Sequence, residues 1–365
     1  MLSASRRTSG SDFNTLCQVE RLESSAWTVH KVIHYSFTLS SEEATEQSDA
    51  QLKGMQLTNT LLDITIIIPN YNTRELLRQC LTSIYSYTQG MTFEVICIDD
   101  NSSDGSADMV AAEFPEAILV RNTSGQMYAK NNNLGMRMSR ARYACLLNSD
   151  TKLIANAFQA LVEFMDDHPD AAACTPRLLN PDGTTQVCVR RFARLGTLIL
   201  QGLNWHKLFP NGIVSNKYYA ANFDHLREQV IEALGSTAFV IRRTTWEKAG
   251  MLDERFPMYQ VDLAYCYTLK MKGFRIYYTP SAEIIHYGSQ SVNQRALAGI
   301  RMQHQGFIDF SDHYDYFSSN LLIKFLIRQA VRLRYWLKLA EFHLSSDKRV
   351  IKGPGRAPIA KSSRG

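Results

Sequence analysis

The feature that most constrains the fold is a regular alternation of short apolar runs with helical stripes between Asp63 and Met165. The runs predict strands at 64–68, 93–98, 117–120 and 143–147, and the stripes predict helices at 76–84, 107–114, 127–139 and 158–165. Strands that alternate with helices over short links are typical of a parallel sheet covered on both faces. The sequence therefore predicts an α/β fold with a mostly parallel central sheet.

Beyond Asp170 the pattern is less regular. Asn180-Pro-Asp-Gly183 predicts a turn inside a hairpin, and residues 190–230 are irregular. Further elements are then predicted, as strands at 236–241, 274–278 and 283–286 and as helices at 244–249 and 262–271. We expect four regions: an N-terminal extension at 1–60, whose order the sequence leaves open, a main α/β domain at 61–290, a helical segment at 291–345 and a disordered basic tail at 346–365.

The net charge of +5 is distributed unevenly along the chain. From Leu321 to the end, eleven Lys and Arg are opposed by two acids, which gives +9 and leaves about −4 for the first 320 residues. Leu321–Leu344 mixes these cations with Leu, Phe and Trp, and two interpretations are open: an amphipathic helix on an anionic membrane surface, or a helix packed on the domain with a solvated basic face. A nucleic-acid binder is not favoured, because the core is slightly acidic.

Targeting signals are not evident in the sequence. No run of 18 or more apolar residues is present, and the first residues lack the apolar region of a signal peptide. The seven cysteines include no C-x-x-C, which favours buried, reduced thiols. We expect a cytoplasmic protein, with docking on the inner face of the cell membrane as an extension of the amphipathic-helix interpretation.

Short, mostly polar stretches follow three of the predicted strands at the point where each strand ends. Their residues are Pro69, Asn70, Tyr71 and Asn72 after the first strand, Asp99 and Asp100 after the second, and Asn148, Ser149 and Asp150 after the fourth. Ligands of open α/β sheets bind at this carboxyl edge, where a carboxylate can hold a divalent cation and the cation a diphosphate. Taken singly, each group is also ordinary turn chemistry.

The first strand is followed by neither a G-x-G-x-x-G nor a G-x-x-x-x-G-K-[ST] motif. A bound diphosphate would therefore need a metal and cationic side chains for neutralisation. The candidate cations are Lys130, Arg190 and Arg191, each of which is also a plausible solvated surface charge.

Several stretches, in order over about residues 61–310, resemble family 2 glycosyltransferases, in particular rhamnosyltransferase-like members that build bacterial polysaccharides. The matching stretches are Ile66-Ile-Ile-Pro-Asn-Tyr-Asn72, Ile98-Asp-Asp-Asn-Ser-Ser-Asp-Gly-Ser106, Ala129-Lys-Asn-Asn-Asn-Leu-Gly135, Leu146-Leu-Asn-Ser-Asp150, Pro176-Arg-Leu-Leu-Asn-Pro-Asp-Gly183, Leu252-Asp-Glu-Arg-Phe-Pro-Met-Tyr259, Gly273 to Pro280 and Ile284-Ile-His-Tyr-Gly288. The resemblance implies a GT-A fold and an inverting hexosyl transfer from a nucleotide-sugar donor to a glycan or lipid-linked acceptor, with Mn²⁺ or Mg²⁺. It leans towards dTDP-rhamnose as the donor.

The resemblance also implies roles for individual residues. Asp150 and His286 would bind the metal, and Asp262 would be the catalytic base. The expected nucleotide-binding residues are Pro69, Asn70, Tyr71, Asn72, Asp99, Asp100, Lys130, Asn133, Asn148 and Ser149. Because Asp262 opens a predicted helix, the helix dipole should keep its carboxylate ionised at neutral pH.

The chain departs from the family pattern at three positions. Val261 and Ala264 stand where the family has further acids, and Met127 stands where it has a glycine. A catalytically silent homologue that binds a nucleotide sugar or glycan is therefore the alternative to an active transferase. A nucleotidyltransferase would need a basic, Gly-rich loop after the first strand, and Pro69–Asn72 is not such a loop.

Overall fold

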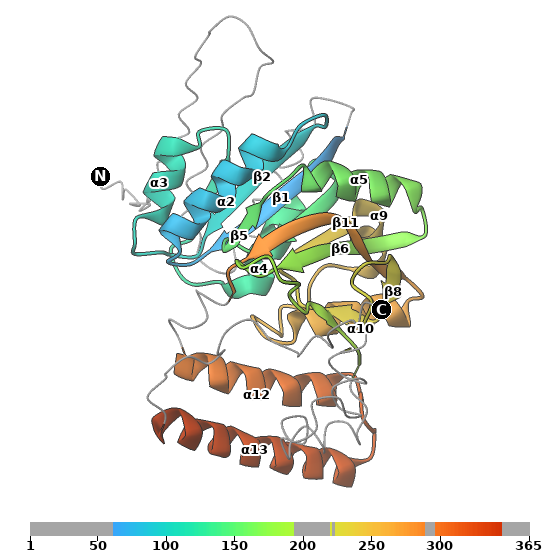
Figure 1. Ribbon diagram of the computed structural model, residues 1–365. Helices are drawn as coiled ribbons and strands as arrows, with labels where there is room; N and C mark the ends of the chain where they lie inside the picture. Colours follow the sequence, from blue (N-terminus) through green and yellow to red (C-terminus); the bar gives the residue numbers. More distant parts are fainter. Residues whose placement is uncertain (1–60, 193–219, 221–222, 289–295, 345–365) are drawn as a thin grey trace, which may run out of the picture.

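The computed structural model describes residues 61–192, 220, 223–288 and 296–344. The predicted extension and basic tail lie outside these residues, as does most of the segment 190–230. The centre is a nine-stranded sheet in the order β3-β2-β1-β4-β10-β6-β11-β5, with β8 pairing with β11 (Figure 1). Its strands are β1 (Leu62–Asn70), β2 (Phe93–Asp99), β3 (Ile118–Arg121), β4 (Ala141–Leu147), β5 (Thr151–Leu153), β6 (Ala171–Leu179), β8 (Gln229–Ile231), β10 (Ala238–Arg242) and β11 (Arg275–His286). A separate pair joins β7 (Val189–Arg190) to β9 (Ala233–Leu234).

The sheet is mostly parallel, which confirms the predicted α/β fold class. β3, β2, β1 and β4 form one parallel block, and β6 and β11 run in the same direction as this block. β10 lies between the two groups and is antiparallel to both of its neighbours, β4 and β6. It starts beside the carboxyl end of β4, with Ala238 opposite Leu147, so the chain enters this strand from the ligand-binding edge itself. The sequence pattern did not predict this reversal.

β6 was also not predicted. Its sequence, AAACTPRLL, is rich in alanine and contains Pro176, both of which lower strand propensity. It is nevertheless buried between β10 and β11, and β10 pairs with it only at Ala173 and Cys174, well before the proline. The two strands predicted at 274–278 and 283–286 are one strand, β11, with a register shift between Thr279 and Glu283. β5 and β8 are short additions beside β11 that the pattern missed as well.

Two smaller predictions are adjusted. β1 continues through Pro69 to Asn70, because its pairing with β4 ends at Ile67 and only β2 accompanies the proline, with Pro69 opposite Ile98. The turn after β6 is present, with the Gly183 N–H donating to the Asn180 carbonyl over 2.9 Å. The strand that would complete a hairpin is reduced to one isolated bridge between residues 179 and 185.

Helices cover both faces of the sheet. They are α2 (Arg74–Tyr87), α3 (Ser106–Glu113), α4 (Met127–Met138), α5 (Ala157–Asp167), α9 (Arg243–Ala249), α10 (Val261–Met271), α12 (Ala296–His313) and α13 (Leu321–Leu344). The strand order advances from β1 to β3 and then reverses to reach β4, and right-handed crossovers therefore place α2 and α3 on one face and α4 on the other. α12 and α13 form a pair of C-terminal helices below the sheet (Figure 1).

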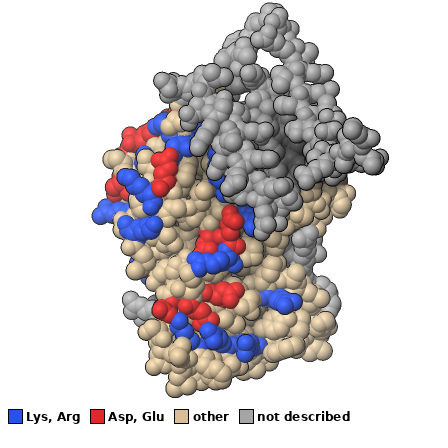
Figure 2. All heavy atoms as spheres, turned by 180° about the vertical axis from the view of Figure 1, so that it is seen from behind, with Lys and Arg blue, Asp and Glu red and all other residues tan. Residues whose placement is uncertain are grey.

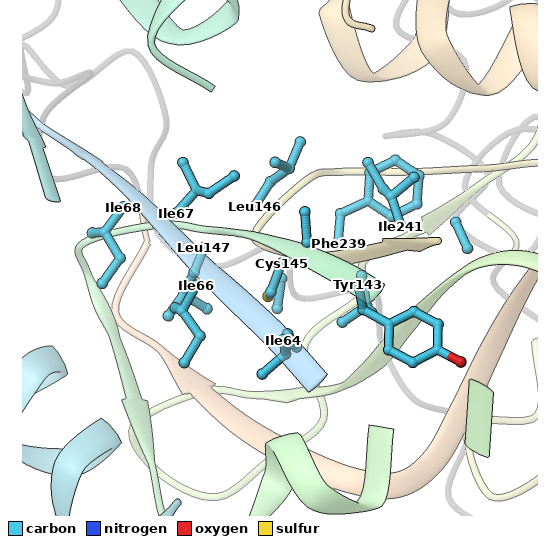
Figure 3. Close-up of a cluster of buried hydrophobic side chains, with 14 of the residues drawn as sticks. Ile64, Ile66, Ile67, Ile68, Tyr143, Cys145, Leu146, Leu147, Phe239 and Ile241 are labelled. Carbon is cyan, nitrogen blue, oxygen red and sulfur yellow. The ribbon is translucent and has the colours of Figure 1, made fainter. Parts of the chain in front are cut away.

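The core lies on both faces of β1 and β4. Ile67 and Leu146 point to one side of the sheet, and Ile64 and Ile66 point to the other (Figure 3). All four are fully buried, as expected for a central strand that reads as a continuous apolar run. On the α4 face, a Cβ added to Gly135 would lie 2.4 Å from Ile67 Cγ2, so the glycine allows the helix to pack directly on the strand.

Candidate active site

The ends of β1, β2 and β4 meet at one edge of the sheet, as the sequence predicted, and side chains join them. Asn70 Nδ2 donates to Asp99 Oδ1 over 3.2 Å, and Thr73 Oγ1 donates to Asn70 Oδ1 over 2.6 Å. Thr73 Oγ1 also lies 2.8 Å from Ser149 Oγ. Thr73, which the sequence interpretation did not single out, therefore connects all three strand ends into one buried network.

The two acids after β2 already accept hydrogen bonds from the protein. Asp99 Oδ2 accepts the N–H of Ser102 over 2.9 Å. Asp100 accepts the N–H groups of Gln126 and Met127, over 2.6 and 3.1 Å, at the start of α4. Met127 has a φ of +68°, which fits its place at a position where the resembled family has glycine. Both acids are buried and help to build the edge, and their contact with a nucleotide stays a prediction.

A polar hollow of about 330 Å³ opens next to Asp99. It is lined by Asp99, Asn101, Ser102, Ser103, Gly105, Ala107, Asp108, Arg121 and Asn122. Asn72, with a φ of +49°, shapes the neighbouring loop by accepting the N–H of Ser103 over 2.8 Å. Arg121 and Asn122 were not predicted, although their position directly after the third predicted strand could have identified them. A hollow with this lining suits a polar heterocycle or a ribose.

Asp150 and His286 are brought together across the sheet. His286 ends β11, and its pairing opposite Thr151 places it beside the loop that follows β4. His286 Nε2 lies 3.2 Å from Asp150 Oδ1, although the two residues are 136 positions apart in the sequence. Both side chains are almost completely buried. The structure therefore brings the two predicted metal ligands into contact distance.

The orientation of the His286 ring is set by Gln186. His286 Nδ1 lies 2.6 Å from Gln186 Oε1, and Gln186 Nε2 donates to Asn180 Oδ1 over 3.0 Å. Because an amide oxygen only accepts, Nδ1 donates its proton to Gln186, and Nε2 points towards Asp150. This buried Nε2 has no hydrogen-bond partner among the described residues. The sequence gave no signal for Gln186 beyond its place just after the predicted turn.

A ring nitrogen and a carboxylate oxygen at this separation can serve together as ligands of one divalent cation. One oxygen and one imidazole nitrogen are suitable ligands for Mn²⁺. Among the described residues, no group of three or more His, Cys, Asp and Glu side chains gathers to hold a metal. The chain thus supplies a two-residue ligand pair that fits a cation whose remaining ligands come from a phosphate or from water.

Asp262 lies in the first turn of α10, next to the same edge. Its carboxylate accepts the N–H of Ser236 over 3.1 Å and the Ser236 hydroxyl over 2.5 Å. The Tyr128 hydroxyl donates to Ser236 Oγ over 2.8 Å, and the Asn148 N–H donates to the Thr237 carbonyl over 2.9 Å. The adjacent residues Ser236 and Thr237 therefore connect Asp262 to the loop at 148–150, which contains Asp150. Neither Ser236 nor Tyr128 was predicted.

The electrostatic environment of Asp262 differs from the one expected. Burial is the largest effect and raises the pKa of the Asp262 carboxyl above its ordinary value, while the hydrogen bonds from Ser236 lower it. The sequence pointed to the helix dipole, which favours the ionised form, whereas burial acts in the opposite direction. A raised pKa suits a group that must take up a proton from a hydroxyl.

Two predicted nucleotide-binding residues lie on α4, away from these contacts. Lys130 is exposed on the helix surface. Asn133 is buried, and its amide accepts the Leu252 N–H and donates to the Leu252 carbonyl and to Glu254 Oε1, over 2.9, 2.8 and 2.9 Å. Asn133 therefore anchors the segment before α10 and does not take part in the hydrogen-bond network at the strand ends.

The segment that leads into α10 also packs against α12. A Cβ added to Gly306 would lie 3.3 Å from the Tyr259 carbonyl, and the rings of Phe310 and Phe256 have centroids 6.2 Å apart. The segment around residues 252–260 is thus held between α4 and α12. This packing fixes the position of Asp262. Val261 and Ala264, where the resembled family has acids, are fully buried in the core.

Comparison with known proteins gives one family match. Residues 65–242 match the model of "Glycosyl transferase family 2". An O-antigen biosynthesis protein, RfbC, from Myxococcus xanthus is 23% identical over 262 residues, which are 70% of this chain and 20% of that protein. An N-acetylglucosaminyl-diphospho-decaprenol L-rhamnosyltransferase from Mycobacterium tuberculosis is 22% identical over 305 residues, 79% of this chain and 97% of that protein. The chain thus spans about a fifth of the first relative and nearly all of the second.

Among solved structures, the mannosyltransferase PcManGT from Pyrobaculum calidifontis, in complex with GDP-Man and Mn²⁺, is similar with a TM-score of 0.46. The sequence identity is 15%, and the match covers 82% of this chain and 83% of that one.

Proposed function

We propose, from the match of residues 65–242 to the glycosyl transferase family 2 model, that the chain is an inverting, metal-dependent glycosyltransferase of polysaccharide biosynthesis. The donor is a nucleotide sugar, with dTDP-rhamnose favoured by the similarity to the mycobacterial rhamnosyltransferase. The acceptor is a hydroxyl of a glycan or of a lipid-linked glycan. The domain boundaries given above, 61–290 and 291–345, stay predictions.

The observation that carries this proposal is the approach of Asp150 to His286 over 3.2 Å at the carboxyl edge of the sheet. Asp99 with its polar hollow lies at the same edge, and Asp262 is connected to it through Ser236 and Thr237. A nucleotide-sugar transferase needs a place for the nucleoside, charge stabilisation for the diphosphate and a base for the acceptor. The arrangement offers one group or hollow for each.

In the proposed reaction, a side chain of the protein takes part in one proton transfer. Asp262 accepts the proton of the acceptor hydroxyl, whose oxygen forms a bond to the anomeric carbon as the bond from that carbon to the phosphate oxygen breaks. The nucleoside diphosphate leaves on the opposite face of the sugar, so the anomeric configuration inverts. Ser236 holds the Asp262 carboxylate through two hydrogen bonds and keeps it directed towards the acceptor.

Asp150 and His286 are the residues that would hold Mn²⁺ or Mg²⁺. A cation bound there stabilises the negative charge that develops on the departing diphosphate. Gln186 contributes by fixing the ring of His286, and Asn148 and Ser149 fix the loop that presents Asp150.

A catalytically silent nucleotide-sugar-binding protein is the second candidate. It is favoured by Val261 and Ala264, which leave Asp262 without neighbouring acids in its helix turn. The two candidates share the metal pair and the polar hollow. They differ in whether a bound donor is consumed.

The test is a donor screen followed by two variants. Thermal shift with a panel of nucleotide sugars and Mn²⁺ identifies a stabilising donor, and release of nucleoside diphosphate is then measured. We expect Asp262→Asn to abolish transfer while nucleotide binding persists, and Asp150→Ala to weaken Mn²⁺-dependent binding. Asp167→Asn, at the exposed end of α5, is the matched control and should keep full activity. Full transfer by Asp262→Asn would refute the assignment of the base, and a donor that binds but is never consumed would favour the silent homologue.

A further inference from the structure

α13 presents a wide apolar surface to solvent. Among its exposed side chains, Leu321, Leu322, Leu333, Trp336, Leu337 and Leu344 are between 62 and 89% exposed, and Phe325 and Leu326 are more than half exposed. At 3.6 residues per turn, these eight side chains fall on one face that occupies about half of the helix circumference. A soluble helix normally turns such a face inward.

The opposite face of α13 is the one that packs on the rest of the chain. Ile327 and Val331 are buried there against α12. Lys324 and Arg328 reach back from this side to Asp312, at the end of α12. The helix therefore packs on the rest of the chain, as one of the two open interpretations expected, but the face that it exposes is mainly apolar. Arg328 and Arg332 lie along one margin of this apolar face.

Positive charges outnumber negative ones on α13. The helix carries Lys324, Arg328, Arg332, Arg334 and Lys338 against Glu341, a net charge of +4. The following sequence, residues 345–365, contains six further Lys and Arg and one Asp. In Figure 2, Lys and Arg side chains lie beside Asp and Glu side chains at the lower end of the molecule, above an uncharged rim.

We propose that the outward face of α13 is a docking surface for an anionic lipid bilayer. The apolar row would enter the boundary between headgroups and acyl chains, and the flanking cations would contact anionic headgroups. Trp336 lies within the row, and tryptophan is favoured at the interfacial depth of a bilayer. No helix in the described ranges has the length and hydropathy to cross a membrane, so α13 lies on the surface.

A lipid surface fits this face better than a second copy of the chain does. If two copies met through the apolar row, the cations at its margins would face cations of the other copy, whereas the row itself contains no acid. An anionic bilayer satisfies the apolar and the charged parts of the face together. The inference rests on α13 alone and is independent of the proposed catalytic residues.

The proposal is tested by co-sedimentation of the full chain with vesicles. We expect binding to vesicles of phosphatidylcholine with 30% phosphatidylglycerol, weak binding to pure phosphatidylcholine, and loss of binding as salt is raised. The double variant Leu333→Ser/Leu337→Ser should bind the anionic vesicles at least about tenfold more weakly, because two apolar side chains are lost from the row. Both side chains are exposed, so their replacement should change the stability of the fold little. Leu226→Ser, 71% exposed outside α13, is the matched control and should bind as the unaltered chain does.

Three outcomes would overturn the proposal. The unaltered chain could fail to sediment with anionic vesicles, or the double variant could bind them as tightly as the control. Alternatively, light scattering could show a dimer that the double variant converts to a monomer, in which case the face is an interface between copies. Circular dichroism of each variant establishes that the helices remain folded, so weaker binding reports on the surface itself.

Discussion

The hydroxyl of Ser236 should control the pH dependence of the transfer reaction. It donates one of two hydrogen bonds that Ser236 makes to the Asp262 carboxylate, and the other comes from the backbone. Ser236→Ala removes only the hydroxyl. The hydrogen bond stabilises the ionised carboxylate, so its loss raises the pKa of Asp262 further, in the same direction as burial does.

The size of the effect follows from the negative charge on the Asp262 carboxylate, which accepts the hydrogen bond. A hydrogen bond to a charged group contributes about 1.5–3 kcal/mol, and about 1.4 kcal/mol corresponds to a tenfold change in proton affinity. Water that enters the site of the lost hydroxyl offsets part of this difference. We therefore expect the acid limb of the pH profile to move upward by about one pH unit.

The assay is kcat/KM for donor consumption in the presence of an acceptor, measured between pH 5 and 9. Asp262 acts as a base only when ionised, so Ser236→Ala should lose activity at the acidic end and approach the unaltered enzyme at the alkaline end. Ser281→Ala is the control, because this exposed residue lies within the bulge of β11, between Thr279 and Glu283, and its hydroxyl contacts Thr279 instead of the site. Its profile should not move.

A different result would refute this reasoning. If Ser236→Ala lowered activity by the same factor at every pH, the hydroxyl would serve only to position the side chain, and the titrating group would be elsewhere. Nucleotide binding, measured by calorimetry, should be unchanged in either case, because Ser236 does not contact Asp99 or the polar hollow.

Two further predictions concern packing and the metal pair. Gly135→Ala should lower the free energy of unfolding in urea by about 1–3 kcal/mol, because the new methyl group overlaps Ile67. Gly235→Ala is the control, because its methyl group meets open space and should leave the stability almost unchanged. Equal effects of the two substitutions would contradict the close approach of α4 to β1. Gln186→Ala should weaken Mn²⁺ binding by about tenfold to a hundredfold in calorimetry, because the ring of His286 loses its fixed orientation, and unchanged affinity would place the metal elsewhere.

The sequence predicted those parts of the site that depend on local pattern. Apolar runs that end in polar triplets predicted that Asp99 and Asp150 would lie at one edge, because parallel strands share their carboxyl ends. The place of His286 beside Asp150 followed from family resemblance, since the pattern gave no sign of β5, to which the end of β11 pairs.

The supporting residues could not be predicted in this way. Ser236 opens a predicted strand and Gln186 follows a predicted turn, but their importance arises from contacts with residues 26 and 100 positions away. The burial that raises the pKa of Asp262 could not be predicted for a related reason. The dipole of a helix can be inferred from a sequence, but burial of the carboxyl group depends on tertiary packing, such as the approach of Ser236.

The antiparallel strand β10 has a consequence for how the chain is made. β4 ends at residue 147, but β10, which covers its free edge, starts at residue 238. At about 5–20 residues per second, a ribosome needs roughly 5–20 s to supply the missing strand. During that interval an apolar strand edge is open to other chains. Expression fragments that stop before Arg242 should therefore aggregate, and the smallest soluble domain should extend through β10 and β11.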